Sequence, residues 1–196
     1  MSKIFPSDPP NAINRMHECG AGNYWFYHLG SFSSDPPLRY HEIIASANTK
    51  IEVWDPYVHI DPANNDLEVF DSVRNNIVLK ILTIKSLHRH PSYLSDLHQT
   101  LKAMIHPSTN LQFGLRVIDK GHATFQSWSF HDRFLIIDDR DVFLIGASIA
   151  SHRTRQHSTG IFKVNNTETS AFIRSVFTEY WIRCSANQVP MQFLHP

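Results

Sequence analysis

The sequence contains only two cysteines among its 196 residues, Cys19 and Cys184. They lie far apart, do not have the spacing of metal-ligating pairs, and are too few for a disulfide framework. We therefore expect a fold that needs no disulfide bonds, and the reducing cytoplasm is its simplest location.

The sequence also lacks a long hydrophobic run. No stretch of about 20 consecutive apolar residues could cross a membrane. The N-terminal segment has neither the apolar run of a signal peptide nor the Arg-rich amphipathic character of a transit peptide, and no basic amphipathic stretch offers a membrane dock. These absences predict a chain that is neither secreted nor stably associated with a membrane.

Charge of one sign is not in excess, because 18 basic residues balance 18 acidic ones. The composition therefore lacks the general attraction that a basic domain has for nucleic acid, and any phosphate site must be local.

Most of the 13 histidines fall in polar stretches typical of loops, which favours surface side chains over a metal site. We expect neither a metal nor another cofactor.

The remaining composition is that of a compact domain, with 42% hydrophobic and 18% charged residues. Residues 1–23, with prolines at positions 6, 9 and 10, are expected to form an irregular lead-in. A single domain is expected over residues 24–196. We interpret the aromatic run at its start, residues 24–27, as part of the core and not as a base-stacking platform.

Beyond residue 35, hydrophobic patterns typical of helices alternate with patterns typical of strands. Such alternation predicts right-handed crossovers between parallel strands, with helices on both faces of the sheet. The predicted helices are 37–48, 65–73 and 91–105, and the predicted strands are 51–58, 77–84 and 111–118.

After Gly121 the predicted strands are closely spaced. Segments 130–138 and 141–148 are expected to form a hairpin, and 160–164 another strand. The last predicted element is a helix over 167–184, begun by a Thr cap with an acidic residue in its first turn. The predicted fold class is α/β, a largely parallel mixed β-sheet flanked by helices on both faces.

The segment most suggestive of chemistry is HDRFLIIDDRDVFLIGAS, which begins at His131. Strand alternation places His131 and Arg133 on one face, and turns Asp132 to the other. The Arg133 guanidinium is permanently charged and its fork matches phosphate oxygens, while histidine can act as nucleophile or acid near neutral pH. An isolated His-x-Arg is more often an exposed strand edge than a catalytic pair. The rest of the segment is therefore needed to distinguish these two interpretations.

The spacing of His131, Arg133 and Asp138 resembles the His-x-Lys-x4-Asp motif of the phospholipase D superfamily. A small-residue turn, 145–148, follows at the family's spacing, and Asp55-Pro56-Tyr57 resembles the end of the family's early strand. The resemblance extends over residues 38–183.

The resemblance implies a metal-independent phosphoryl transfer in two steps. By analogy His131 is the nucleophile or the acid, Arg133 grips phosphate oxygens in place of lysine, and Asp138 orients the site electrostatically. Ser148 takes the position of an asparagine that binds phosphate. Because the chain has one motif, the resemblance also implies a homodimer that brings two half-sites together.

The sequence departs from the family at a third position besides Arg133 and Ser148. Many members have a carboxylate on the following strand that holds the histidine. At the corresponding positions this chain has Ser158 and Thr159. A hydroxyl can accept the imidazole proton but does not stabilise an imidazolium as a carboxylate does. We expect Thr159 to contact the substrate.

Other basic and aromatic side chains are weaker candidates for substrate contacts. Arg153 and Arg155, together with His152, follow the small-residue turn and could approach a phosphate. A basic loop after the strand 77–84 could line a polyanion groove, although such loops are usually only solvated, and Trp128 could stack on a base. The loop's candidates are Lys85, His88, Arg89 and His90.

Two functions stay open. The first is a homodimeric, metal-independent phosphodiesterase, most plausibly a nuclease with a phosphohistidine intermediate and a role in bacterial defence, acting on nucleic acid. The second is a catalytically silent phospholipase D-like module that binds a phosphorylated partner, either nucleic acid or a lipid headgroup. The sequence does not distinguish DNA, RNA and lipid substrates.

Overall fold

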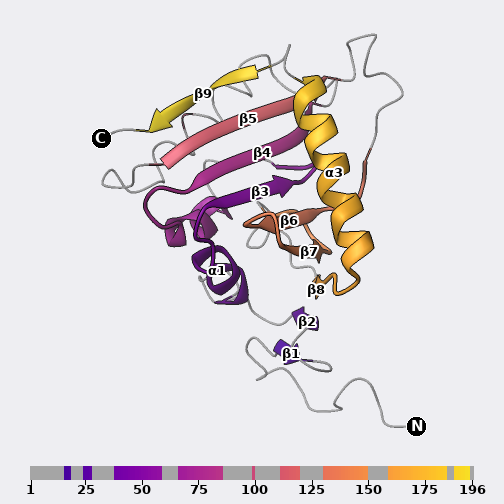
Figure 1. Ribbon diagram of the computed structural model, residues 1–196. Helices are drawn as coiled ribbons and strands as arrows, with labels where there is room; N and C mark the ends of the chain where they lie inside the picture. The colour runs from indigo at the N-terminus through magenta and orange to yellow at the C-terminus, as the bar shows by residue number, and fades with distance from the viewer. Residues whose placement is uncertain are drawn as a thin grey trace, which may run out of the picture.

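A nine-stranded sheet forms the centre of the computed structural model (Figure 1). The structure describes residues 16–18, 24–27, 38–58, 66–85, 99, 111–119, 130–149, 159–184 and 188–194. The strands lie side by side in the order β1-β2-β8-β7-β6-β3-β4-β5-β9. Their bounds are Met16–Glu18 (β1), Tyr24–Tyr27 (β2), Lys50–Trp54 (β3), Val78–Lys85 (β4), Leu111–Asp119 (β5), Phe134–Ile137 (β6), Asp141–Ile145 (β7), Thr159–Lys163 (β8) and Gln188–Leu194 (β9).

The α/β class with a mixed sheet is confirmed, but the parallel part is smaller than expected. Only β3–β4 and β4–β5 pair in parallel among the described strands, whereas the other neighbours are antiparallel. The reason lies in the connections: β6 and β7 follow one another through a short turn, which allows only antiparallel pairing, while parallel strands need a long crossover.

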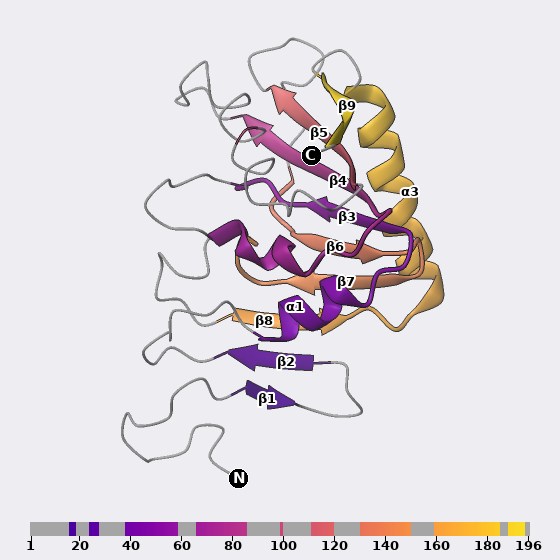
Figure 2. The ribbon, with the colours of Figure 1, turned by 90° about the vertical axis from the view of Figure 1, so that its left-hand side faces the viewer.

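Helices cover both faces of the sheet, as predicted. On one face α1 (Leu38–Ala45) and the 3-10 helix η1 (Asp66–Ser72) pack on alternate residues of the strands. On the other face α3 (Thr167–Arg183) covers a second cluster that contains Trp54 and Ile136. Figure 2 shows α1 and η1 in front of the sheet and α3 behind it.

Three helical predictions differ in detail from the structure. The helix predicted at 37–48 ends at Ala45, and the one predicted at 65–73 is a 3-10 helix. The cap of α3 is Asn166 and not a threonine: its side chain accepts a hydrogen bond from the Thr169 N–H at 2.8 Å. The predicted helix 91–105 lies outside the described residues except for residue 99, which is helical.

The described structure contains three strands that the hydrophobic pattern did not predict. Residues 16–18, expected to be irregular, form β1 and pair with β2, the aromatic run. At the opposite edge β9 pairs antiparallel with β5. β9 contains Pro190, which a sheet tolerates at its edge, where β9 lies.

Candidate active site

Three segments that are distant in sequence meet at one end of β6. Register pairs Trp54 of β3 with Phe134 of β6, so the residues after β3 lie beside those before β6. The same register pairs Phe134 with Leu144 of β7, which brings the turn after β7 to the same place. The site therefore receives side chains from 55–57, 131–133 and 146–149.

Aromatic packing fixes the segment that carries the predicted histidine and arginine. Trp54 contacts Phe130 edge-on with ring centroids 5.0 Å apart and Phe134 at 5.4 Å. These two phenylalanines point to the face that α3 covers. Because side chains alternate along an extended chain, His131 and Arg133 between them project to the opposite side.

Asp55 is the buried anchor of the site. Its side chain is fully buried, and its carboxylate accepts hydrogen bonds from the Ser148 hydroxyl (2.7 Å), the Ile149 N–H (2.7 Å) and the Tyr57 N–H (2.9 Å). Burial raises the pKa of Asp55 above its ordinary value, whereas these three donors and the charge of Arg133 act in the opposite direction. The carboxylate fixes the turn after β7 against the end of β3.

Arg133 is held at three points around this anchor. Its Nε lies 3.7 Å from Asp55 Oδ1, an ion-pair distance too long for a hydrogen bond, and Nη1 donates to the Gly146 carbonyl at 3.1 Å. Its guanidinium carbon lies 4.9 Å from the centre of the Tyr57 ring. With 22% of the side chain exposed, Arg133 is fixed in place but still reaches the surface.

His131 is exposed and lies beside Arg133 along the chain. Its Nδ1 is 3.2 Å from the Tyr57 hydroxyl, so one ring nitrogen has a partner inside the site. The structure thus places the predicted pair together, with an accessible imidazole next to a permanently charged guanidinium.

Ser148 is nearly buried at the base of the site. It is only 5% exposed, and its hydroxyl donates to Asp55 Oδ2 and contacts the Tyr57 carbonyl at 3.2 Å. The sequence predicted a direct hydrogen bond from Ser148 to phosphate. The structure instead shows it supporting the carboxylate that pairs with Arg133.

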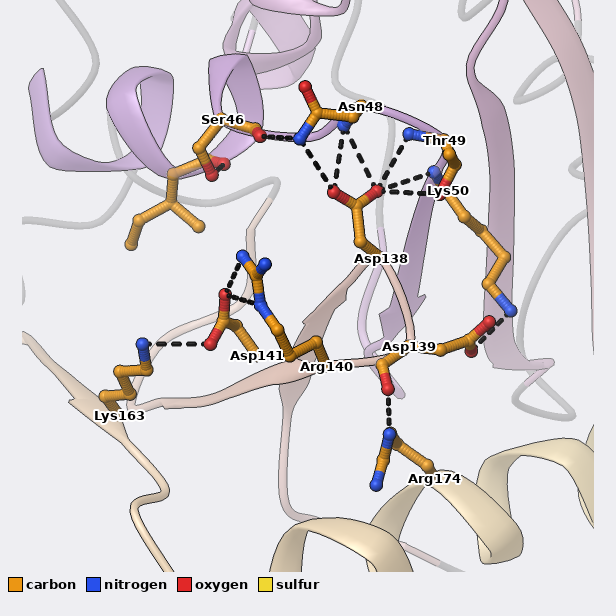
Figure 3. A network of polar contacts seen from close by, with 11 residues as sticks. Ser46, Asn48, Thr49, Lys50, Asp138, Asp139, Arg140, Asp141, Lys163 and Arg174 are labelled. Atoms are coloured by element: carbon orange, nitrogen blue, oxygen red, sulfur yellow. Dashed lines mark hydrogen bonds and ion pairs between the residues drawn. The ribbon is translucent and has the colours of Figure 1, made fainter. Parts of the chain in front are cut away.

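Asp138 lies at the other end of β6. The structure therefore does not bring Asp138 together with His131 and Arg133. Its carboxylate accepts hydrogen bonds from the N–H groups of Asn48, Thr49 and Lys50 and from the Thr49 hydroxyl, at 2.8–3.1 Å (Figure 3). Burial acts to raise the pKa of Asp138, but these hydrogen bonds outweigh it and hold the pKa well below its ordinary value.

The position of Asp138 indicates a role other than the predicted one of orienting the site electrostatically. Asp138 is seven positions along the chain from His131, roughly 20 Å at the rise of a strand. Asp138 and Asp139 both have φ of 53°, a left-handed conformation that aspartate tolerates better than most residues. Asp138 therefore closes the β6–β7 turn and ties it to the start of β3.

The remaining candidates are described in part or not at all. Thr159 begins β8, and nothing is described of its side chain; the next residue, Gly160, accepts a hydrogen bond from the Gly146 N–H at 2.9 Å, which places the start of β8 beside the site. Lys85 ends β4, again without a described side chain. The candidates that lie outside the described residues are His88, Arg89, His90, Trp128, His152, Arg153, Arg155 and Ser158.

Two residues of the site, Asp55 and Tyr57, were not predicted as such. Both follow a buried strand, and the carboxyl end of a strand is where α/β sheets gather ligands. That position was a usable signal, but only the antiparallel pairing of β3 with β6 shows that they meet His131 and Arg133.

Among the described residues, no three His, Cys, Asp or Glu side chains group so as to hold a metal ion. Nor is any described helix long and apolar enough to cross a membrane.

Comparison with known proteins identifies the fold only through solved structures. No family model matches the sequence, and no curated protein matches it. A phosphatidylserine synthase from Haemophilus influenzae Rd KW20 superposes with a TM-score of 0.52 at 17% identity, over 87% of this chain and 39% of the synthase. This likeness to a phospholipase D superfamily structure shows that the chain has a phospholipase D-like fold.

Two further structures are similar at lower scores. The phospholipase D family member Nuc from Salmonella typhimurium gives a TM-score of 0.48 at 14% identity, over 74% of this chain and 86% of Nuc. The archaeal chromatin protein TrmBL2 gives 0.43 at 18% identity, over 85% of this chain and 54% of TrmBL2. The chain thus spans about half of TrmBL2 and less than half of the synthase.

Proposed function

We propose that the chain is a metal-independent phosphodiesterase, and specifically a nuclease. Its site is completed by a second copy of the chain. The observation that carries the proposal is the exposed imidazole of His131 beside Arg133, whose guanidinium the buried Asp55 holds in place. A nucleophile and a fixed positive charge are the two groups that attack on a phosphodiester requires. The phospholipase D-like fold agrees with this chemistry.

In the first step of the proposed reaction, Nε2 of His131 attacks phosphorus with its lone pair. A P–N bond forms, the P–O bond to the leaving group breaks, and the leaving oxygen takes a proton from the imidazolium of a second His131. In the second step water attacks phosphorus, gives its proton to that second imidazole, and the P–N bond breaks. Each histidine ends as it began, so the cycle balances without a metal.

Arg133 supplies the charge that the reaction needs. Within the described part of the chain its hydrogen bond uses Nη1 only, which leaves the N–H groups of Nη2 for phosphate oxygens. Because Asp55 and the Tyr57 ring already fix the guanidinium, little reorganisation is required when negative charge develops on the phosphorane. Asp55 and Ser148 act through Arg133 and do not touch substrate.

The second copy is proposed because one half-site has a nucleophile but no acid. A symmetric dimer with its axis beside His131 would place two imidazoles at one phosphate. Sizing or light scattering should give a particle of two chains. A monomer that turns over substrate at assay concentration would contradict this part of the proposal.

A nuclease is preferred to a lipase because the sequence contains no basic amphipathic stretch of the kind that docks on a membrane. We extend the proposal to a cytoplasmic enzyme of bacterial defence against foreign nucleic acid, with Arg153, Arg155 and Thr159 as contacts to the substrate. These finer assignments rest on the resemblance of the motif.

A second candidate function is a silent module that binds a phosphorylated partner. One observation favours it: the described partner of His131 is a neutral phenol and not the carboxylate that would stabilise an imidazolium. In that case Arg133 would still bind phosphate, but no bond would be cleaved.

Hydrolysis of bis(p-nitrophenyl) phosphate separates the two candidates, with His131→Ala as the control. The phosphodiesterase should release p-nitrophenol in EDTA, and the variant should fall to background. Binding of phosphate that depends on Arg133, without any turnover in either protein, would favour the silent module.

A further inference from the structure

Tyr57 links the two central residues of the proposed site. Its hydroxyl lies 3.2 Å from His131 Nδ1, and its ring centre lies 4.9 Å from the Arg133 guanidinium carbon. No motif singled out its side chain, and 42% of the residue is exposed.

The main chain fixes Tyr57 on both sides. Its N–H donates to Asp55 Oδ1 at 2.9 Å, and its carbonyl receives the Ser148 hydroxyl at 3.2 Å. Asp55 itself is fully buried and pairs with Arg133. The same buried carboxylate therefore sets the positions of the guanidinium and of the tyrosine backbone. The tyrosine hydroxyl in turn contacts His131 and helps to fix its ring.

We propose that Tyr57 is a positioning residue that keeps a proton on Nδ1 of His131 and leaves Nε2 to react. This inference deepens the proposed function and rests on it. Which nitrogen of a histidine carries its proton is set by the hydrogen bond that the other makes. A phenol oxygen that accepts from Nδ1–H holds the neutral ring in the tautomer a nucleophile needs.

The same contact suits both histidines of the proposed cycle. The attacking imidazole is neutral with its proton on Nδ1, whereas the acid is an imidazolium with protons on both nitrogens. Nδ1 carries a proton in each case, so Tyr57 accepts in both copies and never has to change direction. Its own O–H is then free to donate to water.

Tyr57 replaces the carboxylate that Ser158 and Thr159 do not provide, but as a weaker partner. A neutral oxygen orients the imidazole without stabilising the positive charge as strongly. The ring over Arg133 supplies rigidity, because a cation–π contact and a hydrogen bond together restrict both torsions of the side chain.

The tautomer of His131 can be read directly by two-bond ¹H–¹⁵N spectra of protein labelled at histidine. Spectra recorded at about pH 8, where an ordinary histidine is neutral, should show the proton on Nδ1 of His131 in the wild type. Tyr57→Phe, which keeps the ring over Arg133, should lose this preference and move the proton toward Nε2. Thr178→Val on α3, which removes an exposed hydroxyl bonded only within the helix in the described contacts, is the control and should leave the His131 signals unchanged.

An unchanged tautomer in Tyr57→Phe, or a wild type with the proton on Nε2, would overturn the inference. This arm requires no turnover, so it also tests Tyr57 in a protein that proves inactive, where the proposed function alone fails.

Turnover provides the second arm. Tyr57→Phe should lower kcat on bis(p-nitrophenyl) phosphate by about tenfold to a hundredfold, since proton placement is lost, with KM within about twofold because Arg133 is unaffected. A rise in KM at constant kcat would show that Tyr57 contacts substrate and does not position His131.

Discussion

The two ends of strand β6 carry parts of the same motif but differ in how their polar groups are satisfied. At the end before the strand, Arg133 makes one hydrogen bond and a 3.7 Å ion pair, and His131 is exposed. At the end after the strand, Asp138 accepts from three consecutive N–H groups and a hydroxyl. A saturated carboxylate has no capacity for a ligand, whereas an incompletely bonded guanidinium has. The comparison separates the end that we propose to react, called the reacting end below, from an architectural end.

Neighbouring residues reinforce this contrast. Around Asp138, Lys50 pairs with Asp139 at 2.5 Å and the Asp139 carbonyl accepts from Arg174 of α3 (Figure 3). Asp141 pairs with Lys163 at 2.9 Å. The architectural end thus joins β3, the β6–β7 turn, β8 and α3, while the reacting end has one buried carboxylate at its base.

The largest expected effect of a substitution outside the histidine is at Arg133. Arg133→Ala should reduce kcat/KM on bis(p-nitrophenyl) phosphate by about a hundredfold to a thousandfold, because a transition-state contact of this kind contributes roughly 3–4 kcal/mol. It should also destabilise the fold by about 1–3 kcal/mol in urea unfolding, since the buried Asp55 loses its charged partner but keeps its three hydrogen bonds.

Arg133→Lys is the matched control for this position. It keeps the charge without the planar fork and should retain part of the activity and most of the stability. Wild-type turnover in both variants would remove Arg133 from the chemistry and end the distinction between the two ends.

A substitution at Asp138 should lower stability but leave activity unchanged. Asp138→Asn tolerates the left-handed turn but removes the charge, and should cost about 1–2 kcal/mol of unfolding free energy because solvent reaches this carboxylate and screens it. Activity per folded molecule should stay within about twofold of wild type. A loss of kcat comparable with that of Arg133→Ala, in protein shown to be folded, would restore the electrostatic role that the motif suggested.

The smallest expected effect is on the pH dependence of stability. The pKa of Asp138 is lower in the folded than in the unfolded chain, so its contribution is complete above the unfolded value near pH 4 and is lost as pH falls toward the folded value. The stability difference between wild type and Asp138→Asn should therefore be largest at neutral pH and shrink in acid. An equal difference at neutral pH and at about pH 3 would contradict the assigned hydrogen bonds.

The sequence predicted the reacting pair because its signal is local. His131 and Arg133 lie two residues apart, and alternation between Phe130 and Phe134 suffices to direct them to one side. The α/β class and the helices on both faces were predictable for the same reason, since hydrophobic periodicity is a local property.

The contacts of the supporting residues with this pair were not predictable because they depend on register. Asp55 meets Arg133 and Tyr57 meets His131 only through the antiparallel pairing of β3 with β6, which no local pattern encodes. Ser148 was predicted to face phosphate because a motif gives spacing and not burial. The edge strands β1 and β9 are short or contain proline, and their pairing depends on partners far along the chain.

The central claim is that His131 attacks phosphorus without a metal, and trapping its phosphoryl adduct tests this most directly. Wild-type protein reacted in excess EDTA with a phosphodiester labelled in its phosphate, then quenched and mapped, should carry an acid-labile phosphoryl group on His131 that is absent from His131→Ala. Activity abolished by EDTA and restored by magnesium or manganese, with no adduct on His131, would contradict the account.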